Sequence, residues 1–330
     1  MKKALVWLFL FFALVNILYA VDTVQVKQIY DGVKYYHIKT EEPLSIFLLE
    51  IDLSKKIKFE LSYANNVIGS DGEQISKMSN RMVSEGEQII AGINSDFFGG
   101  DPYVAENSMV KSGNVFKGVN INRSLIGFNN ENVPCIHKFR FNGFIQSDEN
   151  KIRIDQMNAF SDTDKVFLFN KNYSIDIDLQ KEQSGIIIQP ISDTSNYGLN
   201  EYKIVKIFNE KLPKFVFGDR NLIILPSDYI KLYNLNEGKK ILVNLSFDPS
   251  IKDLYTLVGG LPRLMEGGKP IDDFTGREGM FNKKFFGKNP RTAIGYNLKS
   301  NKMYIVAVDG RRDNYSVGMT LKELSYYMFS

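Results

Sequence analysis

The chain has 330 residues, of which 44% are hydrophobic and 13% aromatic, a composition typical of a globular protein and not of a disordered one. Its formal net charge is +3, too small to predict bulk electrostatic attraction to nucleic acid or to an anionic membrane surface. Cys135 is the single cysteine and the chain has two histidines, which excludes an intrachain disulfide, a multi-cysteine metal site and a three-histidine zinc site.

The N-terminus has the pattern of a signal peptide. Met1-Lys2-Lys3 is a short basic region, the run from Ala4 to Leu18 is apolar except for Asn16, and Ala20 is a small residue suited to a cleavage position. An uncleaved membrane anchor is the alternative, although the run falls slightly short of the roughly 20 residues that a span needs. Nothing later resembles a transmembrane helix. We therefore predict removal of residues 1–20 and export to the periplasm, the cell surface or the medium.

Residues 21 to 84 predict several strands followed by a helix. The strand-like segments are "KYYHIKT", "SIFLLEIDL" and "IKFELSYA", which alternate or run apolar between polar turns. In "QISKMSNRMVS" at 74–84, Ile75, Met78 and Met82 share one helical face. "EQIIAGIN" at 87–94 then has the character of a buried strand that leads into polar residues and paired glycines.

The middle of the chain, from about 131 to 250, predicts further sheet. Short strand-like segments alternate with turns rich in Asn, Asp, Gly and Ser, namely "KIRIDQMN", "KVFLFN", "YKIVKIFN", "NLIILP" and "KILVNLSF". The polar stretch at 180–200 predicts a surface loop. Together these patterns indicate an α+β fold of twisted, mostly antiparallel sheets with a few flanking helices.

A short internal repeat indicates a duplication within this fold. Residues 122–129, "NRSLIGFN", resemble residues 290–297, "PRTAIGYN". The helix predicted before "IIAGIN" also has a counterpart near the C-terminus, in "LKELSYYM". The repeat pairs Arg123 with Arg291.

Three segments concentrate residues suited to chemistry. They are Asn94-Ser95-Asp96, the stretch Pro290-Arg291, and the run from Asp309 to Thr320. Pro290 excludes a central position in a regular strand, so we expect Arg291 to begin a strand at the rim of a sheet. Thr320 and Glu323 have capping-box spacing, which predicts a helix that starts there and offers free backbone N–H groups to an anion.

Each of these features also has a structural interpretation. Arg291 is also suited to pair with a surface carboxylate, and Asp309-Gly310 to form a plain hairpin turn. Asp96 is suited to cap a turn, and Thr320 with Glu323 to serve only the helix. Asp272-Asp273 is more typical of a solvated loop than of metal ligands.

Four motifs resemble the phosphodiester glycosidase family, the group of the N-acetylglucosamine-1-phosphodiester alpha-N-acetylglucosaminidase. They are "INSDFF", "VGGLPRLMEGGK", "NPRTAIGY" and "VDGRRDNYSVGMTLKEL". The resemblance covers residues 85–330 and implies a division into 1–20, 21–84 and a glycosidase-like domain at 85–330. Family members continue past the "MTLKEL" helix with a strand and an Asp-Gly-Gly-Gly-like loop, so the comparison predicts that this domain lacks its C-terminal strand and loop.

The resemblance implies hydrolysis of a sugar-1-phosphodiester at the anomeric carbon. The spacing of the carboxylates fits no standard metal motif, so we assign no metal, and we expect no cofactor. Asp96, Asp309 and Arg291 are the expected catalytic residues, and the assignment requires that they converge on one ligand. The expected substrate-binding residues are Asn94, Arg311, Ser316, Gly318, Thr320 and Arg123. The expected partner is a carbohydrate phosphodiester of cell-envelope or exopolysaccharide glycans; no nucleic acid is expected, and the sequence leaves the oligomeric state open.

Two alternatives remain open at this point. The first alternative is that the chain is a catalytically inactive protein of the same fold that binds glycans or another partner. A chain that lacks a strand also risks folding poorly, because an uncovered sheet edge and apolar surface favour aggregation.

Overall fold

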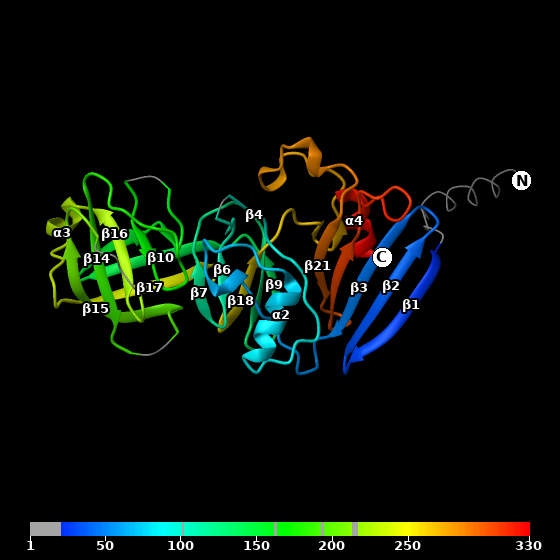
Figure 1. Cartoon of the computed structure of the whole chain (residues 1–330), viewed down its shortest axis with the longest axis horizontal. Coiled ribbons are helices and arrows are strands. Elements are labelled where there is room, and N and C mark those ends of the chain that lie inside the picture. The colour runs from blue at the N-terminus through cyan, green and yellow to red at the C-terminus, as the bar shows by residue number, and fades with distance from the viewer. Residues whose placement is uncertain (1–20, 101, 162–163, 193–194, 213–216) are drawn as a thin grey trace, which may run out of the picture. The chain divides into compact units, whose positions relative to one another are not determined.

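The computed structural model (Figure 1) describes most of the chain after the predicted signal peptide. The described residues are 21–100, 102–161, 164–192, 195–212 and 217–330. The predicted signal peptide at 1–20 lies outside them, so export stays a prediction. In the described ranges, no helix combines the length and the apolar character that a membrane crossing requires.

The chain divides into two compact units that alternate along the sequence. The terminal unit comprises the residues up to Lys55, Leu264–Thr275 and Phe281–Ser330. The central unit comprises Lys56–Arg263 and Gly276–Met280. The division that we expected at 84/85, between an N-terminal segment and a glycosidase-like domain, stays a prediction.

The terminal unit is built on a five-stranded antiparallel sheet in the order β1-β2-β3-β22-β21. Its strands are β1 (Val21–Tyr30), β2 (Val33–Thr40), β3 (Leu44–Asp52), β21 (Arg291–Asn297) and β22 (Lys302–Val308). The register of β3 and β22 runs from Ile46↔Val308 to Asp52↔Lys302, so the first and last parts of the chain share one sheet.

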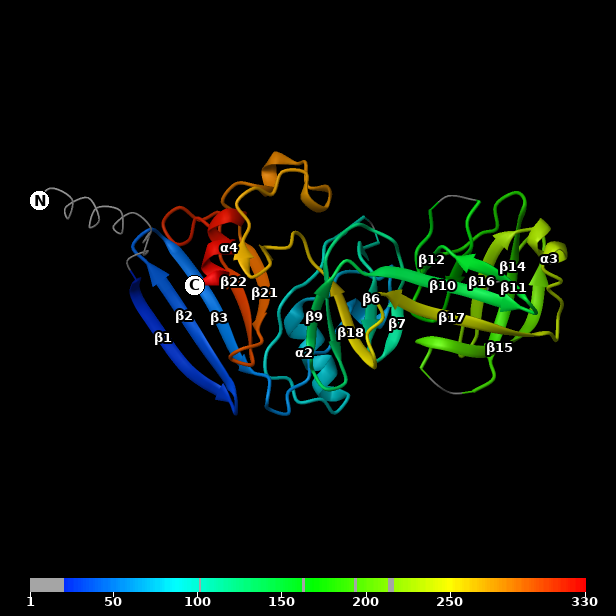
Figure 2. The ribbon, with the colours of Figure 1, turned by 180° about the vertical axis from the view of Figure 1, so that it is seen from behind.

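Helix α4 (Leu321–Phe329) lies beside β21 and β22 in both views (Figures 1 and 2). It starts as the sequence predicts, because Thr320 accepts from the Glu323 backbone while the Glu323 carboxylate accepts from the Thr320 backbone. Leu324 of the helix packs in an apolar cluster with strand residues and with Met319 of the preceding loop. The strand residues are Leu44, Ile46, Ala293, Val306 and Val308. A short hairpin of β19 (Met265–Glu266) and β20 (Lys269–Pro270) belongs to the same unit.

The larger sheet of the central unit has eight strands in the order β11-β10-β17-β15-β14-β16-β13-β12. All neighbours are antiparallel except β12 and β13, which are parallel. Figure 2 shows β10, β17 and β15 alongside one another. The strands are β10 (Arg140–Ser147), β11 (Asn150–Ile154), β12 (Gln156–Met157), β13 (Phe167–Phe169), β14 (Gln183–Pro190), β15 (Gly198–Phe208), β16 (Asn221–Pro226) and β17 (Lys240–Asp248).

A five-stranded antiparallel sheet in the order β7-β6-β18-β8-β9 completes the central unit, with a β4–β5 hairpin and short helices. The strands are β4 (Phe98–Gly99), β5 (Val104–Ala105), β6 (Met109–Lys111), β7 (Asn114–Lys117), β8 (Leu125–Asn129), β9 (Pro134–His137) and β18 (Leu254–Gly259). The helices are α2 (Ile75–Ser84) and α3 (Asp228–Leu232). Side chains of both sheets share one apolar cluster, in which Val110 and Leu257 contact the core of the larger sheet.

The predicted antiparallel sheets with few helices are confirmed, and the chain is mostly β, with 43% of residues in strands and 11% in helices. The duplication stays a prediction. Both copies of the short repeat form strands, but β8 has a partner on each side whereas β21 lies at a sheet edge.

Three expectations about local structure are wrong. The segment "IKFELSYA" at 57–64 is not a strand, because residues 57–63 have no regular secondary structure and Ala64 begins a short 3-10 helix. Residues 183–190 are not a surface loop but strand β14, which lies between β15 and β16 with Ile186 and Ile188 buried. Residues 87–94 are not a buried strand: Ala91 and Gly92 are exposed, and no described strand pairs with them. An apolar segment forms a buried strand only where the fold supplies a strand to pair with it. Residues 183–190 have such partners and residues 87–94 do not.

The unexpected position of β14 can be tested with two isoleucines of one segment. Ile188 is fully buried, so Ile188→Ala removes apolar contacts and leaves a cavity, which lowers the free energy of unfolding by about 2–5 kcal/mol. Ile191 lies just past the strand and is 46% exposed, so Ile191→Ala changes stability much less. Urea unfolding followed by circular dichroism measures both. Equal effects of the two substitutions would contradict the buried position of β14.

Candidate functional site

Two polar clusters contain the predicted site residues, one in each unit. The first lies in the terminal unit at the end of the β21–β22 hairpin. Arg291 opens β21, as predicted, and pairs with Val308, the last residue of β22. Arg291 therefore lies next to the start of the segment 309–320, which we call the Asp309 loop.

Ser45 on β3 holds the Asp309 loop against the sheet. The Asp309 backbone N–H donates to the Ser45 carbonyl (3.0 Å), and the Ser45 N–H donates to the Ser316 hydroxyl (3.0 Å). That hydroxyl in turn donates to the Asp309 carbonyl (2.7 Å). Ser45 and Ser316 are both fully buried, so the contacts observed for the Ser316 hydroxyl are structural.

Asn289 holds the other side of the loop. It exchanges two backbone hydrogen bonds with Met319 (3.1 and 3.0 Å). Gly318 has φ +89°, and a Cβ atom there would lie 2.4 Å from the Asn289 carbonyl oxygen, so this close approach requires glycine. Thr320 caps α4. The contacts of Gly318 and Thr320 are thus structural, and their part in substrate binding stays a prediction.

The Arg291 guanidinium faces backbone carbonyls. Its Nε donates to the Met319 carbonyl (2.8 Å), and its Nη2 donates to those of Phe285 (2.6 Å) and Gly287 (2.8 Å). Burial, with the adjacent positive charge of Arg311, lowers the pKa of Arg291. The observed contacts are those of a brace between the 285–287 turn and the Asp309 loop. The part of Arg291 in binding a phosphate stays a prediction.

Arg311 presents the exposed cation of this cluster. Its backbone lies in the left-handed region (φ +61°), its side chain is exposed, and its Nη2 donates to the Asn289 side-chain oxygen (2.9 Å). Asp309, two residues earlier, is half-buried. The loop thus offers a carboxylate and an accessible guanidinium on one rigid turn.

The second cluster surrounds Asp96 in the central unit. Asp96 has φ +55°, an uncommon conformation for a residue other than glycine that is enriched at functional sites. Its carboxylate accepts from the backbone N–H of Phe97 (2.7 Å) and of Asn107 (3.1 Å), and from the Asn107 side-chain amide (2.5 Å). Burial raises the pKa of Asp96 against the opposing effect of these donors and of Lys117.

The sequence did not single out Lys117 or Asn107. Lys117, at the end of β7, is 4% exposed, and Asn107 is 1% exposed. The only feature of the sequence that could have indicated the burial of Lys117 is its position directly after the apolar pair Val115-Phe116. Burial lowers the pKa of Lys117 to about 8.

Two further motifs lie beside Asp96. The Arg123 guanidinium forms an ion pair with Glu106, the residue before Asn107. The Asp96 N–H donates to the carbonyl of Gly259 (3.1 Å), part of the "VGGLPR" motif. The structure therefore brings Asp96, Arg123 and this motif together, whereas Asn94 is exposed two residues before Asp96.

The two clusters belong to different units, and the structure describes each unit by itself. Arg291, Asp309, Arg311, Ser316, Gly318 and Thr320 lie in the terminal unit, whereas Asn94, Asp96 and Arg123 lie in the central unit. Arg291 and Asp309 are neighbours, as the assignment requires. Their convergence with Asp96 on one ligand stays a prediction.

Other polar features of the described residues offer less. No group of three or more His, Cys, Asp or Glu side chains in the described ranges has an arrangement suited to a metal ion. Asp272 forms an ion pair with Lys322 (2.9 Å) and accepts from the Tyr326 hydroxyl (3.0 Å), contacts that account for it structurally.

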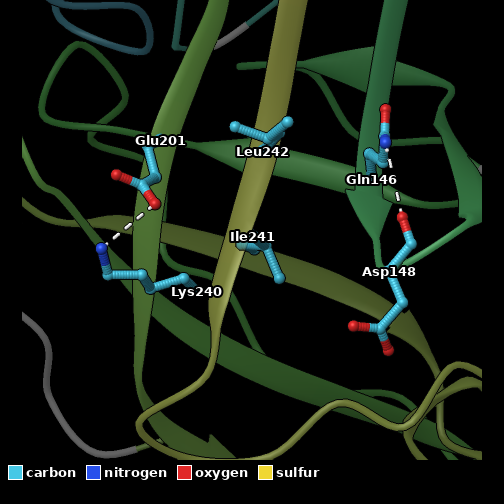
Figure 3. Close-up of a pocket in the computed structure, with 6 residues that line it drawn as sticks. All are labelled: Gln146, Asp148, Glu201, Lys240, Ile241 and Leu242. Atoms are coloured by element: carbon cyan, nitrogen blue, oxygen red, sulfur yellow. Dashed lines mark hydrogen bonds and ion pairs between the residues drawn. The ribbon is translucent and has the colours of Figure 1, made fainter.

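An open pocket lies on β10, β15 and β17, and it contains none of the predicted site residues (Figure 3). In it, Glu201 and Lys240 form an ion pair (3.3 Å), and the Gln146 amide donates to the Asp148 carbonyl (3.4 Å). Asp148 also pairs with Lys239 (2.6 Å). Because these charges are already matched by neighbours, the pocket offers less reactive chemistry than the two clusters.

Comparison with known proteins supports the resemblance found in the sequence. Residues 216–330 match the model of the phosphodiester glycosidase family. The matched segment contains the Asp309 loop and the "VGGLPR" motif but not Asp96 or Arg123. The match is with the family and singles out no individual enzyme, and no curated protein matches the chain.

Two solved structures share the fold. A hypothetical protein from Synechocystis has a TM-score of 0.69 at 16% identity, and the alignment covers 93% of this chain and 56% of that one. A protein from Burkholderia pseudomallei K96243, whose name describes it as exported, has a TM-score of 0.62 at 16% identity, with 88% and 66% covered. The chain thus spans little more than half of the first of these proteins.

The packing of the Asp309 loop predicts a strong effect of one glycine substitution. Gly318→Ala forces a side chain into a left-handed conformation and against the Asn289 backbone, and we expect a loss of about 1–3 kcal/mol of stability. Gly287→Ala is the matched control, because no atom lies within 4 Å of a Cβ placed there. Denaturant unfolding compares the two, and equal stability of both variants would contradict the packing described for Gly318.

Proposed function

We propose that this protein is an exported phosphodiester glycosidase. It hydrolyses sugar-1-phosphodiesters at the anomeric carbon, which releases the sugar and leaves a phosphomonoester on the other product. The observation that carries the proposal is the family match, because it covers the Asp309 loop and its exposed Arg311. Family membership implies a carbohydrate substrate, and we propose cell-envelope or exopolysaccharide glycans.

The leaving group determines which residues the reaction needs. An alkoxide must be protonated by a general acid as it leaves a sugar. A phosphate monoester leaves without that help if fixed cations and N–H donors stabilise its growing negative charge. Arg311 suits this role because its guanidinium is exposed and can offer two donors to phosphate oxygens. Arg291 supports it indirectly by holding the loop.

A carboxylate is still needed, either as the nucleophile or as the base that activates water. Asp309 lies on the same turn as Arg311. Asp96 is the other candidate, since its carboxylate is held in one orientation by three N–H donors. Both enter the proposal, with Arg123 and Asn94 as substrate contacts.

Export is part of the proposal and rests on the N-terminal pattern at residues 1–20. A structure of the same fold belongs to a protein named as exported, which agrees with this assignment. An extracytoplasmic location also suits a substrate in surface glycans.

Hydrolysis of a defined diester tests the function. We expect the purified protein to convert an N-acetylglucosamine-1-phosphate methyl diester to free sugar and methyl phosphate, followed by ³¹P NMR. Arg311→Ala lowers kcat by about 100-fold, because one charge-assisted contact to the leaving group is lost. Asp309→Asn and Asp96→Asn each lower kcat by about 100-fold or more. Arg312→Ala, the exposed neighbour, is the matched control and retains activity.

The outcome also separates the enzyme from its alternative. Binding of such diesters without turnover, in the wild type and in Arg311→Ala alike, would identify a glycan-binding protein of the same fold. If the wild type and Arg311→Ala hydrolyse the diester equally well, the protein is an enzyme but Arg311 does not stabilise the leaving group.

A further inference from the structure

A lysine inside the central unit is unusual in its environment. Lys117 is 4% exposed and lies at the end of β7, beyond Val115 and Phe116. Transfer of an ammonium group from water into a protein interior is costly unless hydrogen bonds and opposite charge compensate it. A methionine would fill a similar volume at no such cost, so the charge itself calls for an explanation.

The ammonium contacts one short segment. Its Nζ donates to the carbonyl of Ala105 and to that of Glu106 (3.4 Å). Among the described residues, no carboxylate oxygen lies within ion-pair distance of it. Lys117 therefore fixes backbone carbonyls instead of closing a salt bridge.

The same segment holds Asp96 through its next residue. Asn107 donates from its backbone N–H to one Asp96 oxygen (3.1 Å) and from its side-chain amide to the other (2.5 Å). Asn107 is fully buried, and the Glu106 N–H donates to the Phe97 carbonyl (2.8 Å). The ammonium thus fixes the carbonyls of Ala105 and Glu106, and Asn107 binds the carboxylate through its own N–H groups.

The two charges also influence each other. Asp96 and Glu106 are the acidic groups that act on Lys117, and both raise its pKa, but burial outweighs them and lowers the pKa to about 8. Lys117 in turn lowers the pKa of Asp96 against the effect of burial. Below about pH 8 the ammonium is present, and above this pH the group is neutral and Asp96 loses its compensating charge.

We propose that Lys117 is a positioning residue for Asp96: its buried ammonium fixes segment 105–107, through which Asn107 orients the carboxylate. This inference rests on the proposed function, in which Asp96 serves the hydrolytic reaction. It adds an alkaline limit to activity that Asp96 alone would not produce, because a neutral amine donates weaker hydrogen bonds to the Ala105 and Glu106 carbonyls than an ammonium does and so holds segment 105–107 less firmly.

The pH profile of kcat/KM tests the role. We expect wild-type activity to fall above about pH 8. In Lys117→Arg this alkaline limb is absent, because a guanidinium stays charged throughout the range. In Lys117→Met the acid limb moves to higher pH, because Asp96 has lost its positive neighbour. Lys111→Met is the matched control: this half-buried lysine on β6 is influenced by Glu60 and Glu85, not by Asp96, and its removal leaves the profile unchanged.

A second readout does not depend on activity. Carbon-13 NMR of labelled aspartate follows the titration of Asp96, identified by its loss in Asp96→Asn. We expect a higher midpoint in Lys117→Met than in the wild type, and no change in Lys111→Met. An unchanged midpoint in folded Lys117→Met overturns the inference, whether or not the protein is active. A raised midpoint together with an inactive wild type overturns the proposed function instead. If Lys117→Met does not fold, an alkaline limb near pH 8 that persists in Lys117→Arg overturns the inference.

Discussion

The pairing of β3 with β22 is the constraint on which the terminal unit depends. It joins residues about 250 positions apart in the sequence along all of β22 and most of β3, from Ile46↔Val308 to Asp52↔Lys302. The pairing brings Ser45, next to Ile46, against Asp309, next to Val308. Every polar contact that Ser45 makes with the Asp309 loop follows from this register. A shift by one residue would turn Ser45 to the opposite face of the sheet and release the loop.

The surroundings of Asp96 also depend on contacts between residues that are distant in the sequence. A left-handed turn, a buried asparagine and a buried lysine are each unfavourable in isolation, because each restricts the backbone or removes a polar group from water. Here Asn107 donates to Asp96, and Lys117 donates to the segment that carries Asn107, so each feature supports the next. Such matched sets of unfavourable features are more typical of a functional site than of a core that only provides stability.

Local signals in the sequence predicted part of this arrangement. The capping box at Thr320 and the start of a strand at Arg291 depend on residues within one turn of each other, so they could be identified directly. Most strands of the central unit were also predictable from their alternation. Strand β14 was not, because its burial depends on β15 and β16 on either side. The segment 87–94 was misjudged for the converse reason: its apolar sequence has no strand beside it among the described residues.

The sequence by itself determined that the chain folds as antiparallel sheets with few helices, and its motifs resembled the phosphodiester glycosidase family over residues 85–330, of which the family model matches 216–330. Periodicity and motif spacing are local properties, so they can be identified without knowledge of the fold. The tertiary structure decided what each side chain contacts. It showed Arg291 bound to backbone carbonyls, left Arg311 exposed beside Asp309, and placed Lys117 behind the segment that holds Asp96. These are contacts between residues distant in sequence, and only the pairing of strands brings them together.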